Sequence, residues 1–383
     1  MAIHFFHVAD IHLESPFKGI QELPTEWQER LRKASFEAFD AIIQDAENHS
    51  PDFIVLAGDL YDGENRSLRA QRHFQKAMER LAALQIPVYI IHGNHDHLGG
   101  RWTRFSLPPN VHVFPDKPTA AFFQTKDHKV QLAGFSYPTR HLTDSFIQHY
   151  PEREADVDFA IGLLHGSEQT QTEHDVYAPF TIDQLKAIGY DYWALGHIHK
   201  RQVIHENPSI VYSGTIQGRH RKETGQQGYY SVTLSHHQTT LDFCPVATTL
   251  FETTELELAE TSSIEQLIET ITSHLLQQQW GEQHVLVQVT LSTKRMNWLG
   301  ATTDSELQEY IREQVTELLP TVYMTQLRFN WQNELSPYFQ TLLESAEVVN
   351  PPAALRTYAQ QESVQQLVKE KIQALLVQRS DQS

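Results

Sequence analysis

The chain has 383 residues, which is long for one domain and sufficient for two, and 40% of them are apolar, enough to form a sizeable core. Its 30 Lys and Arg against 48 Asp and Glu give a net charge of −18, which excludes coating of nucleic acid or anionic membrane by bulk charge but not a local phosphate site. A single cysteine excludes a disulfide framework and a cysteine-ligated zinc site, and without a long apolar run or signal-peptide pattern we expect a cytoplasmic protein.

Short apolar runs that end abruptly in polar residues recur along the first two-thirds of the chain. These runs are 3–9, 53–57, 88–91, 159–164 and 192–195. Apolar runs without polar alternation are typical of strands that are buried on both faces of a sheet. The sequence therefore predicts buried strands that each deliver polar side chains where they end.

Helical patterns separate the first of these runs. Thr25 and Gln28 form a capping-box pattern that opens a helix toward Gln44, and 68–84 has the spacing of a second helix. This alternation of strand and helix predicts an α/β core with the polar motifs at the carboxyl ends of its strands, where open α/β sheets hold ligands.

The composition changes after Pro245. Helices are expected at 264–278 and 304–318, and strands at 284–292 and 321–331. Beyond Ser336 and Pro337 a polar, Gln-rich tail contains one amphipathic helical segment, which could dock on a partner or pack on its own domain. We therefore predict three parts: 1–248, a small α+β unit at 249–335, and a helical tail at 336–383.

The strand ends of the first part carry side chains that ligate hard divalent cations. These residues are Asp10, His12, Asp59, Asn94, His165, His197 and His199, with His95 beside them. Their number suits two ions, and their types permit Mn, Fe or Zn equally. In Asp10-x-His12 and His197-x-His199 an extended backbone would direct both side chains to one face. Asp59 could bridge two ions, and the neutral oxygen of Asn94 limits the negative charge near a phosphate.

The motifs D-x-H, G-D-x-x-D at 58–62, G-N-H-D at 93–96, H-G at 165–166 and G-H-x-H at 196–199 together resemble the signature of the calcineurin-like metallophosphoesterases. Segments 9–19 and 213–220 are similar to SbcD-type DNA repair exonucleases, in particular their YhaO-like branch, and 249–335 resembles the capping domain of those nucleases. The implied fold is α/β: a metallophosphoesterase β-sandwich flanked by helices, a small α+β capping domain and a helical C-terminal tail.

The resemblance implies two metal sites and the Mn²⁺ that this family prefers. The first site would use Asp10, His12, Asp59 and His199, and the second would use Asp59, Asn94, His165 and His197. Archaeal and eukaryotic relatives carry a histidine that assists the chemistry at the position of Asp62, so Asp62 is assigned no catalytic role.

The expected mechanism is attack on phosphorus by a hydroxide held between the two cations, in line with the leaving sugar oxygen. His95 follows the ligand Asn94 directly and would protonate that oxygen. The neighbouring Asp96 either orients His95 or is a carboxylate of a turn or helix N-cap. The basic residues Arg219, Arg221 and Lys222 either contact DNA phosphates or belong to a solvated loop.

These features favour a DNA exonuclease or endonuclease that processes DNA ends in double-strand-break repair. The alternative is a small-molecule phosphatase or cyclic-nucleotide phosphodiesterase, which can use the same ligands. A non-catalytic scaffold is a third reading, although ligands usually decay in such proteins and all seven are present here. The resemblance further implies DNA, an SMC-like ABC ATPase of the SbcC kind and a second copy of the chain as partners.

Overall fold

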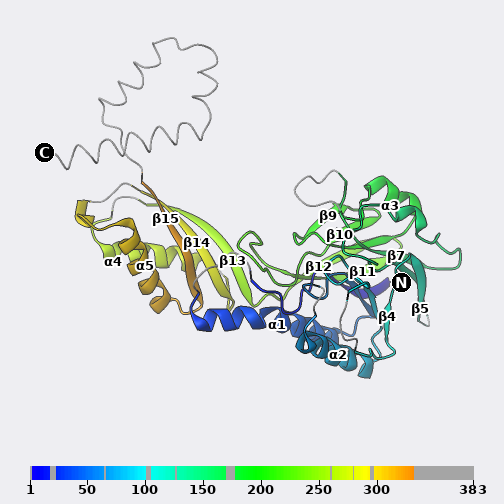
Figure 1. Ribbon diagram of the computed structural model, residues 1–383. Helices are drawn as coiled ribbons and strands as arrows, with labels where there is room; N and C mark the ends of the chain where they lie inside the picture. The colour runs from blue at the N-terminus through cyan, green and yellow to red at the C-terminus, as the bar shows by residue number, and fades with distance from the viewer. Residues whose placement is uncertain are drawn as a thin grey trace, which may run out of the picture.

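The computed structural model describes residues 2–17, 23–63, 66–100, 105–125, 127–169, 177–258, 261–278, 280–293 and 297–331. The predicted tail at 336–383 lies outside the described residues. The described part contains five α-helices and three sheets, of six, six and three strands, which confirms the predicted α/β class (Figure 1). None of the described helices combines the length and apolarity that crossing a bilayer requires.

The first sheet has the strand order β12-β11-β1-β2-β3-β4. Its strands are β1 (Ala2–Val8), β2 (Phe53–Ala57), β3 (Val88–Ile91), β4 (Val111–Val113), β11 (Gly228–Ser235) and β12 (Thr239–Pro245). Strands β1 to β4 are parallel, and β11 and β12 complete the sheet antiparallel. Every residue of β2 and β3 is buried, as their unbroken apolar sequences predict, because both faces of this sheet are covered.

The second sheet has the order β5-β6-β7-β8-β10-β9. Its strands are β5 (Thr119–Gln124), β6 (Lys129–Gly134), β7 (Phe159–His165), β8 (Tyr192–Gly196), β9 (Gln202–His205) and β10 (Ser209–Tyr212). The two sheets pack face to face through side chains such as Phe5, Phe53 and Tyr192, and the rings of Phe5 on β1 and Tyr192 on β8 lie 5.2 Å apart. The result is a β-sandwich.

Helices cover the outer faces of the sandwich. Helices α1 (Thr25–His49) and α2 (Leu68–Ala83) pack on the first sheet, and α3 (Ile182–Ile188) packs on the second. The capping box expected at Thr25 does not form: Pro24 is the N-cap residue, and the Gln28 amide instead donates to the Leu23 carbonyl. Thr25 is already helical, so its hydroxyl is one position too late to cap.

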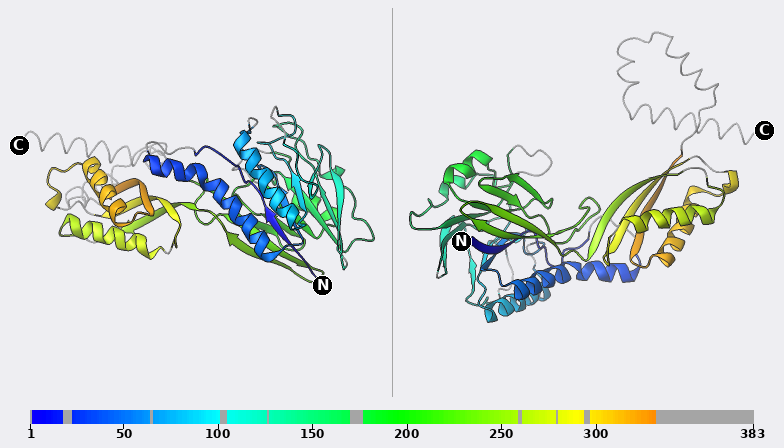
Figure 2. Two further views of the ribbon diagram at one scale, coloured as in Figure 1. Left: turned by 90° about the horizontal axis from the view of Figure 1, so that it is seen from below. Right: turned by 180° about the vertical axis from the view of Figure 1, so that it is seen from behind.

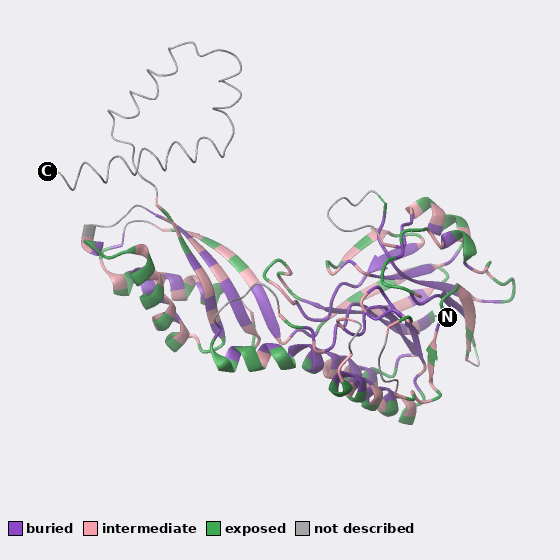
Figure 3. Cartoon of the chain, viewed as in Figure 1, coloured by how far each residue is buried: buried purple, intermediate pink, exposed green. Residues whose placement is uncertain are grey.

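Residues 249–331 form a separate unit around the third sheet, with order β13-β14-β15. It contains β13 (Thr249–Glu257), α4 (Ile264–Gln277), β14 (His284–Thr293), α5 (Asp304–Leu318) and β15 (Val322–Trp331). All three strands are parallel, and β13 was not expected from the sequence. One sheet face packs on α4 and α5 through Val285, Val287 and Val289. Along β14, buried residues alternate with partly exposed ones (Figure 3), as expected when one sheet face is more covered than the other.

Helix α1 is shared between the sandwich and the second unit. Its first turns reach the third sheet, where Trp27 and Leu31 pack with Phe251 and Leu286, and its remaining turns pack on the first sheet (Figure 2). The rings of Trp27 and Tyr323 lie 5.6 Å apart. The apolar end of the open sheet face is therefore covered by α1, and the polar remainder of that face is not.

Candidate metal centre

The loops that follow β1, β2, β3, β7 and β8 meet at one edge of the sandwich. The amide of Asp10 donates to the Gly58 carbonyl at 3.2 Å, and that of His12 donates to the Asp59 carbonyl at 3.0 Å. Both carboxylate oxygens of Asp10 accept from the amide of His197 at 3.1 Å. Backbone bonds therefore tie the loops after β1 and β2 together, and the Asp10 carboxylate ties them to the loop after β8 of the second sheet.

Four of the predicted ligands have a left-handed backbone. The φ angles are 49° at Asp10, 46° at His12, 51° at Asp59 and 94° at His197. The extended backbone expected for Asp10-x-His12 is therefore wrong, and the two side chains converge through the left-handed bends. Such conformations cost non-glycine residues of order 1–3 kcal/mol each and cluster at functional sites.

The first cluster consists of Asp10, His12 and His199, whose ligand atoms lie within 4.8 Å of one another. The Nε2 atoms of His12 and His199 are 3.1 Å apart. The Oδ2 atom of Asp59 lies 3.6 Å from Nε2 of His12. The structure thus brings together the four residues expected at the first metal site.

The second cluster gathers around Asn94. Its Oδ1 atom lies 3.0 Å from Nε2 of His165 and 3.3 Å from Nδ1 of His197. Asp59 Oδ2 is 3.4 Å from Nε2 of His165. The same oxygen of Asp59 therefore faces one imidazole of each cluster, which is the position a bridging carboxylate must occupy.

Hydrogen bonding at His165 shows that the second cluster fits a cation. The Nδ1–H group donates to the Ala57 carbonyl at 3.0 Å, so in the neutral imidazole Nε2 carries the lone pair and faces the acceptor oxygens of Asn94 and Asp59. Burial lowers the pKa of His165, but the Asp59 and Asp10 carboxylates and the Ala57 carbonyl together outweigh burial and raise the pKa to about 9. The oxygens of Asn94 and Asp59 and the Nε2 atom of His165 are therefore stabilised by a positive charge between them. A divalent ion supplies that charge when the imidazole is neutral.

At His12 the effect of burial on the pKa prevails. It lowers the pKa of this imidazole to about 3, and the positive charge of Arg219 acts in the same direction. His12 is therefore neutral at physiological pH, which is the form that ligates metals. Carboxylate, amide and imidazole together suit Mn²⁺, Fe²⁺ or Zn²⁺.

Two motif glycines are required by close packing at this centre. A Cβ atom on Gly58 would lie 2.4 Å from Nδ1 of His165, and one on Gly196 would lie 2.0 Å from the Ala57 carbonyl oxygen. Gly58 also has a φ of 93°, which disfavours any side chain. The glycines of the G-D and G-H motifs thus leave room for the His165 imidazole.

His95 lies at the edge of this centre, where its side chain is 26% exposed. Its Nδ1 atom is 3.1 Å from Oδ1 of Asp62, and its amide donates to Oδ1 of Asp59 at 2.9 Å. The carboxylate in contact with the His95 ring is therefore that of Asp62, which the sequence analysis left without a role. The sequence did contain this carboxylate, because Asp62 is the fifth residue of the G-D-x-x-D motif.

Asp62 contacts more than His95. Its carboxylate accepts from the Arg219 guanidinium at 2.8 Å and from the Ser15 hydroxyl at 3.1 Å, and it lies 3.5 Å from Nδ1 of His12. Burial alone would raise its pKa, but the hydrogen bonds from His12 and His95 and the charge of Arg219 hold the pKa well below the usual range. Asp62 is thus ionised, and its carboxylate connects His12, His95 and Arg219 beside the first cluster.

Asp96 has a different set of contacts. Its carboxylate accepts from the amides of Leu60 and Gly93 at 2.9 and 2.7 Å, and lies 2.8 Å from Nδ1 of His92. These are the contacts of a carboxylate that shapes a turn, one of the two alternatives for this residue. Its role in orienting His95 stays a prediction.

The three basic residues of the 219–222 loop are separated in space. Arg219 is at the centre: its side chain is 15% exposed, and one guanidinium nitrogen lies 3.4 Å from Nε2 of His199. Arg221 points toward the second unit, and Lys222 is exposed. Only Arg219 thus contacts predicted ligands.

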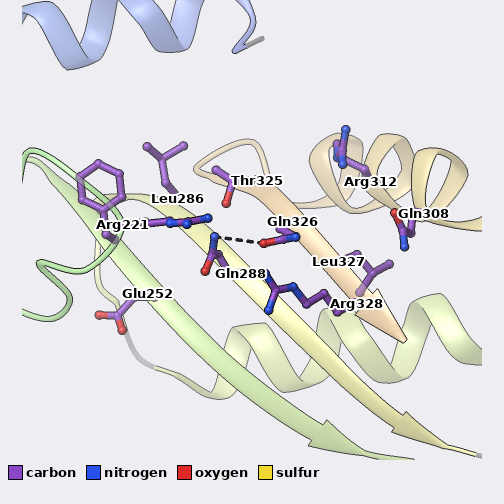
Figure 4. Close-up of a pocket in the computed structure, with 11 residues that line it drawn as sticks. Arg221, Glu252, Leu286, Gln288, Gln308, Arg312, Thr325, Gln326, Leu327 and Arg328 are labelled. Atoms are coloured by element: carbon purple, nitrogen blue, oxygen red, sulfur yellow. Dashed lines mark hydrogen bonds between the residues drawn. The ribbon is translucent and has the colours of Figure 1, made fainter. Parts of the chain in front are cut away.

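Arg221 lines a polar cavity of about 400 Å³ on the second unit (Figure 4). Arg312 of α5 and Arg328 of β15 line the same cavity, together with Gln288 and Gln326, whose amides are hydrogen-bonded at 3.3 Å. Among the described residues, none of the three arginines forms an ion pair, and the buried Nε of Arg312 has no hydrogen-bond partner. Glu252 also lines the cavity, so three arginines against one carboxylate leave a locally positive groove in a chain of charge −18.

Comparison with known proteins agrees with this geometry. The family model described as calcineurin-like phosphoesterase matches residues 3–201, which span all the predicted ligands. The chain is 38% identical over 354 residues to a protein of Bacillus subtilis (strain 168) named "Uncharacterized metallophosphoesterase YhaO". That match covers 90% of this chain and 86% of the relative.

Proposed function

Because the chain belongs to the calcineurin-like phosphoesterase family, we propose that it is a two-metal phosphodiesterase that processes DNA ends. Two divalent cations would be held by Asp10, His12, Asp59 and His199 and by Asp59, Asn94, His165 and His197. When bound, such ions supply Lewis acidity toward phosphate oxygens and an activated water. The convergence of acceptor atoms around Asp59 supports this part of the proposal.

His95 is the proposed general acid. Asp62 holds its Nδ1 atom, so Nε2 is left to donate a proton to the leaving sugar oxygen. The ring lies at the exposed edge of the centre, 5.1 Å from that of His12, where a phosphodiester would enter. General acids of this kind contribute about 10²- to 10⁴-fold to the rate.

Arg219 is the proposed phosphate contact. Asp62 and Ser15 fix one end of its guanidinium at 2.8 and 3.2 Å, which reduces the entropy lost on binding. The other end of the guanidinium lies beside His199, at the metal centre. From there it could donate a charge-assisted hydrogen bond to a bound phosphate oxygen.

A polymeric substrate is favoured by the groove of Arg221, Arg312 and Arg328, because Arg221 belongs to the same loop as Arg219 of the metal centre. Arg219 and Arg221 are two residues apart, so their Cα atoms are within about 7 Å. A nucleic acid strand whose scissile phosphate lies at Arg219 would thus place neighbouring phosphates near the groove. A small phosphate ester would gain nothing from these arginines. This observation is the one that carries the DNA substrate.

The first experiment tests hydrolysis by the purified chain with Mn²⁺. End-labelled linear DNA and bis-p-nitrophenyl phosphate are offered in parallel, with Asp59→Ala and His95→Ala as variants. We expect the wild type to hydrolyse both substrates, and both variants to lose most of the activity. If the wild type bound two Mn²⁺ ions per chain but hydrolysed neither substrate, the proposal would be contradicted. The alternative of a non-catalytic scaffold would then be favoured.

A second experiment separates DNA from small esters. The double variant Arg312→Gln/Arg328→Gln should cleave DNA about tenfold more slowly, equivalent to ~1.4 kcal/mol, because it removes two phosphate contacts. Its rate with bis-p-nitrophenyl phosphate should not change. Arg72→Gln, on the surface of α2, is the matched control. Equal DNA cleavage by the double variant and the control would favour the small-molecule phosphatase or cyclic-nucleotide phosphodiesterase.

We also propose that an SMC-like ABC ATPase of the SbcC kind is the partner, on the basis of the resemblance alone. Co-purification of such an ATPase with the full chain, and faster DNA cleavage in its presence, are the expected results. The absence of both would leave the chain as a nuclease that acts without it.

A further inference from the structure

Glu223 contacts the metal centre although it belongs to neither proposed metal site nor the proposed chemistry. Its Oε1 atom accepts from Nδ1 of His199 at 2.5 Å, and its Oε2 atom accepts from the amide of Arg219 at 2.5 Å. His220 lies 3.4 Å from the same carboxylate. The Glu223 side chain is 9% exposed, so these contacts are shielded from water.

The first of these bonds determines the tautomer of His199. A carboxylate cannot donate, so Nδ1 of His199 must carry the proton and Nε2 must carry the lone pair. That Nε2 atom faces Nε2 of His12 at 3.1 Å, where the first cation would lie. Carboxylates that accept from the far nitrogen of a metal-bound imidazole fix its ring and raise its basicity.

In the second cluster, the orientation of His165 depends on the backbone instead. Nδ1 of His165 donates to the backbone carbonyl of Ala57, which no substitution at position 57 removes. The two proposed metal sites therefore differ: the orientation of His199 depends on a carboxylate side chain, and that of His165 depends on the backbone of the β2 strand.

The second bond links the same carboxylate to the proposed phosphate contact. Glu223 holds the backbone of Arg219, while Asp62 and Ser15 hold the guanidinium. A shift of the Glu223 carboxylate would therefore move a ligand of the first cation and the residue that meets the phosphate together.

We propose that Glu223 is a positioning residue, which orients His199 for the first metal ion and at the same time holds Arg219 in place for the phosphate. This role rests on the metal centre of the proposed function. It does not depend on whether the substrate is DNA.

The test is titration of the metal-free chain with Mn²⁺ by isothermal calorimetry. The wild type should bind two ions per chain, and Glu223→Ala should bind one ion as before and the other about 10- to 100-fold more weakly. Glu223→Gln should lie between them, because its amide can accept from His199 but presents a second donor to the amide of Arg219. Glu206→Ala, in the exposed turn before β10, is the control.

Binding of inorganic phosphate in the presence of saturating Mn²⁺ tests the link to Arg219. Arg219→Gln should weaken phosphate binding without weakening Mn²⁺ binding, because it removes a positive charge from beside His12 and His199, whereas Glu223→Ala should weaken both. Wild-type affinity for both ions in Glu223→Ala would overturn the proposal, and so would equal weakening of both ions in a variant that melts like the wild type. A wild type that shows the expected titrations but cleaves no DNA would contradict only the nuclease function.

Discussion

Two carboxylates outside the expected ligand set, Asp62 and Glu223, contact three of the histidines at the metal centre. Asp62 meets His12 and His95, and Glu223 meets His199. Both carboxylates also bond to Arg219, one to its side chain and the other to its backbone. The orientation of the centre thus depends on residues that surround the ligands as well as on the ligands.

At this scale we predict that Asp62→Asn lowers the rate of hydrolysis about 100-fold while two Mn²⁺ ions remain bound. The amide keeps the size of the carboxylate but loses the charge that holds Arg219 and the ring of His95. Steady-state kinetics with bis-p-nitrophenyl phosphate should show the loss in kcat. Glu14→Gln, on the neighbouring loop, should retain the wild-type rate; a normal kcat in Asp62→Asn would contradict the assigned contact.

The sequence predicted the ligand types and their order because each motif is local. It did not predict the left-handed backbone at Asp10, His12, Asp59 and His197, which the crossing of loops from two sheets imposes. For the same reason the Arg219 partner of Asp62 and the His199 partner of Glu223 were not predicted, since they lie 157 and 24 positions away along the chain. Contacts of that kind depend on tertiary structure and have no local pattern.

Among the elements, α1 shows most clearly how tertiary packing overrides local signals. The sequence predicted a helix that begins with a capping box and ends near Gln44, whereas the helix runs from Thr25 to His49 with Pro24 as its N-cap residue. Its first turns are stabilised by apolar contacts of Trp27 and Leu31 with the second unit rather than by a side-chain cap. The strand β13 escaped prediction because charged and polar residues alternate along its exposed half.

At the scale of elements we predict that Trp27→Ala lowers the free energy of unfolding by about 3 kcal/mol, the usual cost of truncating a buried aromatic side chain. Trp27 is 4% exposed and packs between α1 and the third sheet. DNA cleavage should fall, because the groove loses its position relative to the centre, while hydrolysis of bis-p-nitrophenyl phosphate should not. Chemical denaturation and parallel rate assays check this expectation.

The matched control for Trp27→Ala is Leu276→Ala, which truncates an apolar side chain of α4 that is 64% exposed. We expect no measurable change in stability or in either rate for this control. If Trp27→Ala slowed the hydrolysis of both substrates equally, the proposed division of roles would be wrong, in which the metal centre performs hydrolysis and the groove binds DNA.

For the whole molecule, the charge of −18 opposes DNA binding, and the acceptor-rich centre concentrates negative charge in its interior. Bound cations relieve that repulsion in the folded state alone. Metal binding and folding are therefore linked, and the stability of the chain depends on the free metal concentration.

We accordingly predict that Mn²⁺ at 100 times its Kd raises the stability by about 2.7 kcal/mol for each occupied site. Thermal melts should shift upward with Mn²⁺ and return on addition of EDTA. Asp59→Ala removes the carboxylate common to both clusters, so its Tm should respond little to the metal. A Tm of the wild type that is independent of Mn²⁺ would argue against the proposed centre.

The sharing of α1 has a consequence for how this architecture can change during evolution. A gene shortened after position 248 would still encode the whole sandwich, but Trp27 and Leu31 of α1, and Leu23 just before it, would be exposed to water without Phe251 and Leu286 to cover them. Such an ancestor or descendant would need polar residues at these three positions. A sandwich-only homologue should therefore be recognisable from the first two turns of its first helix, before the rest of its sequence is read.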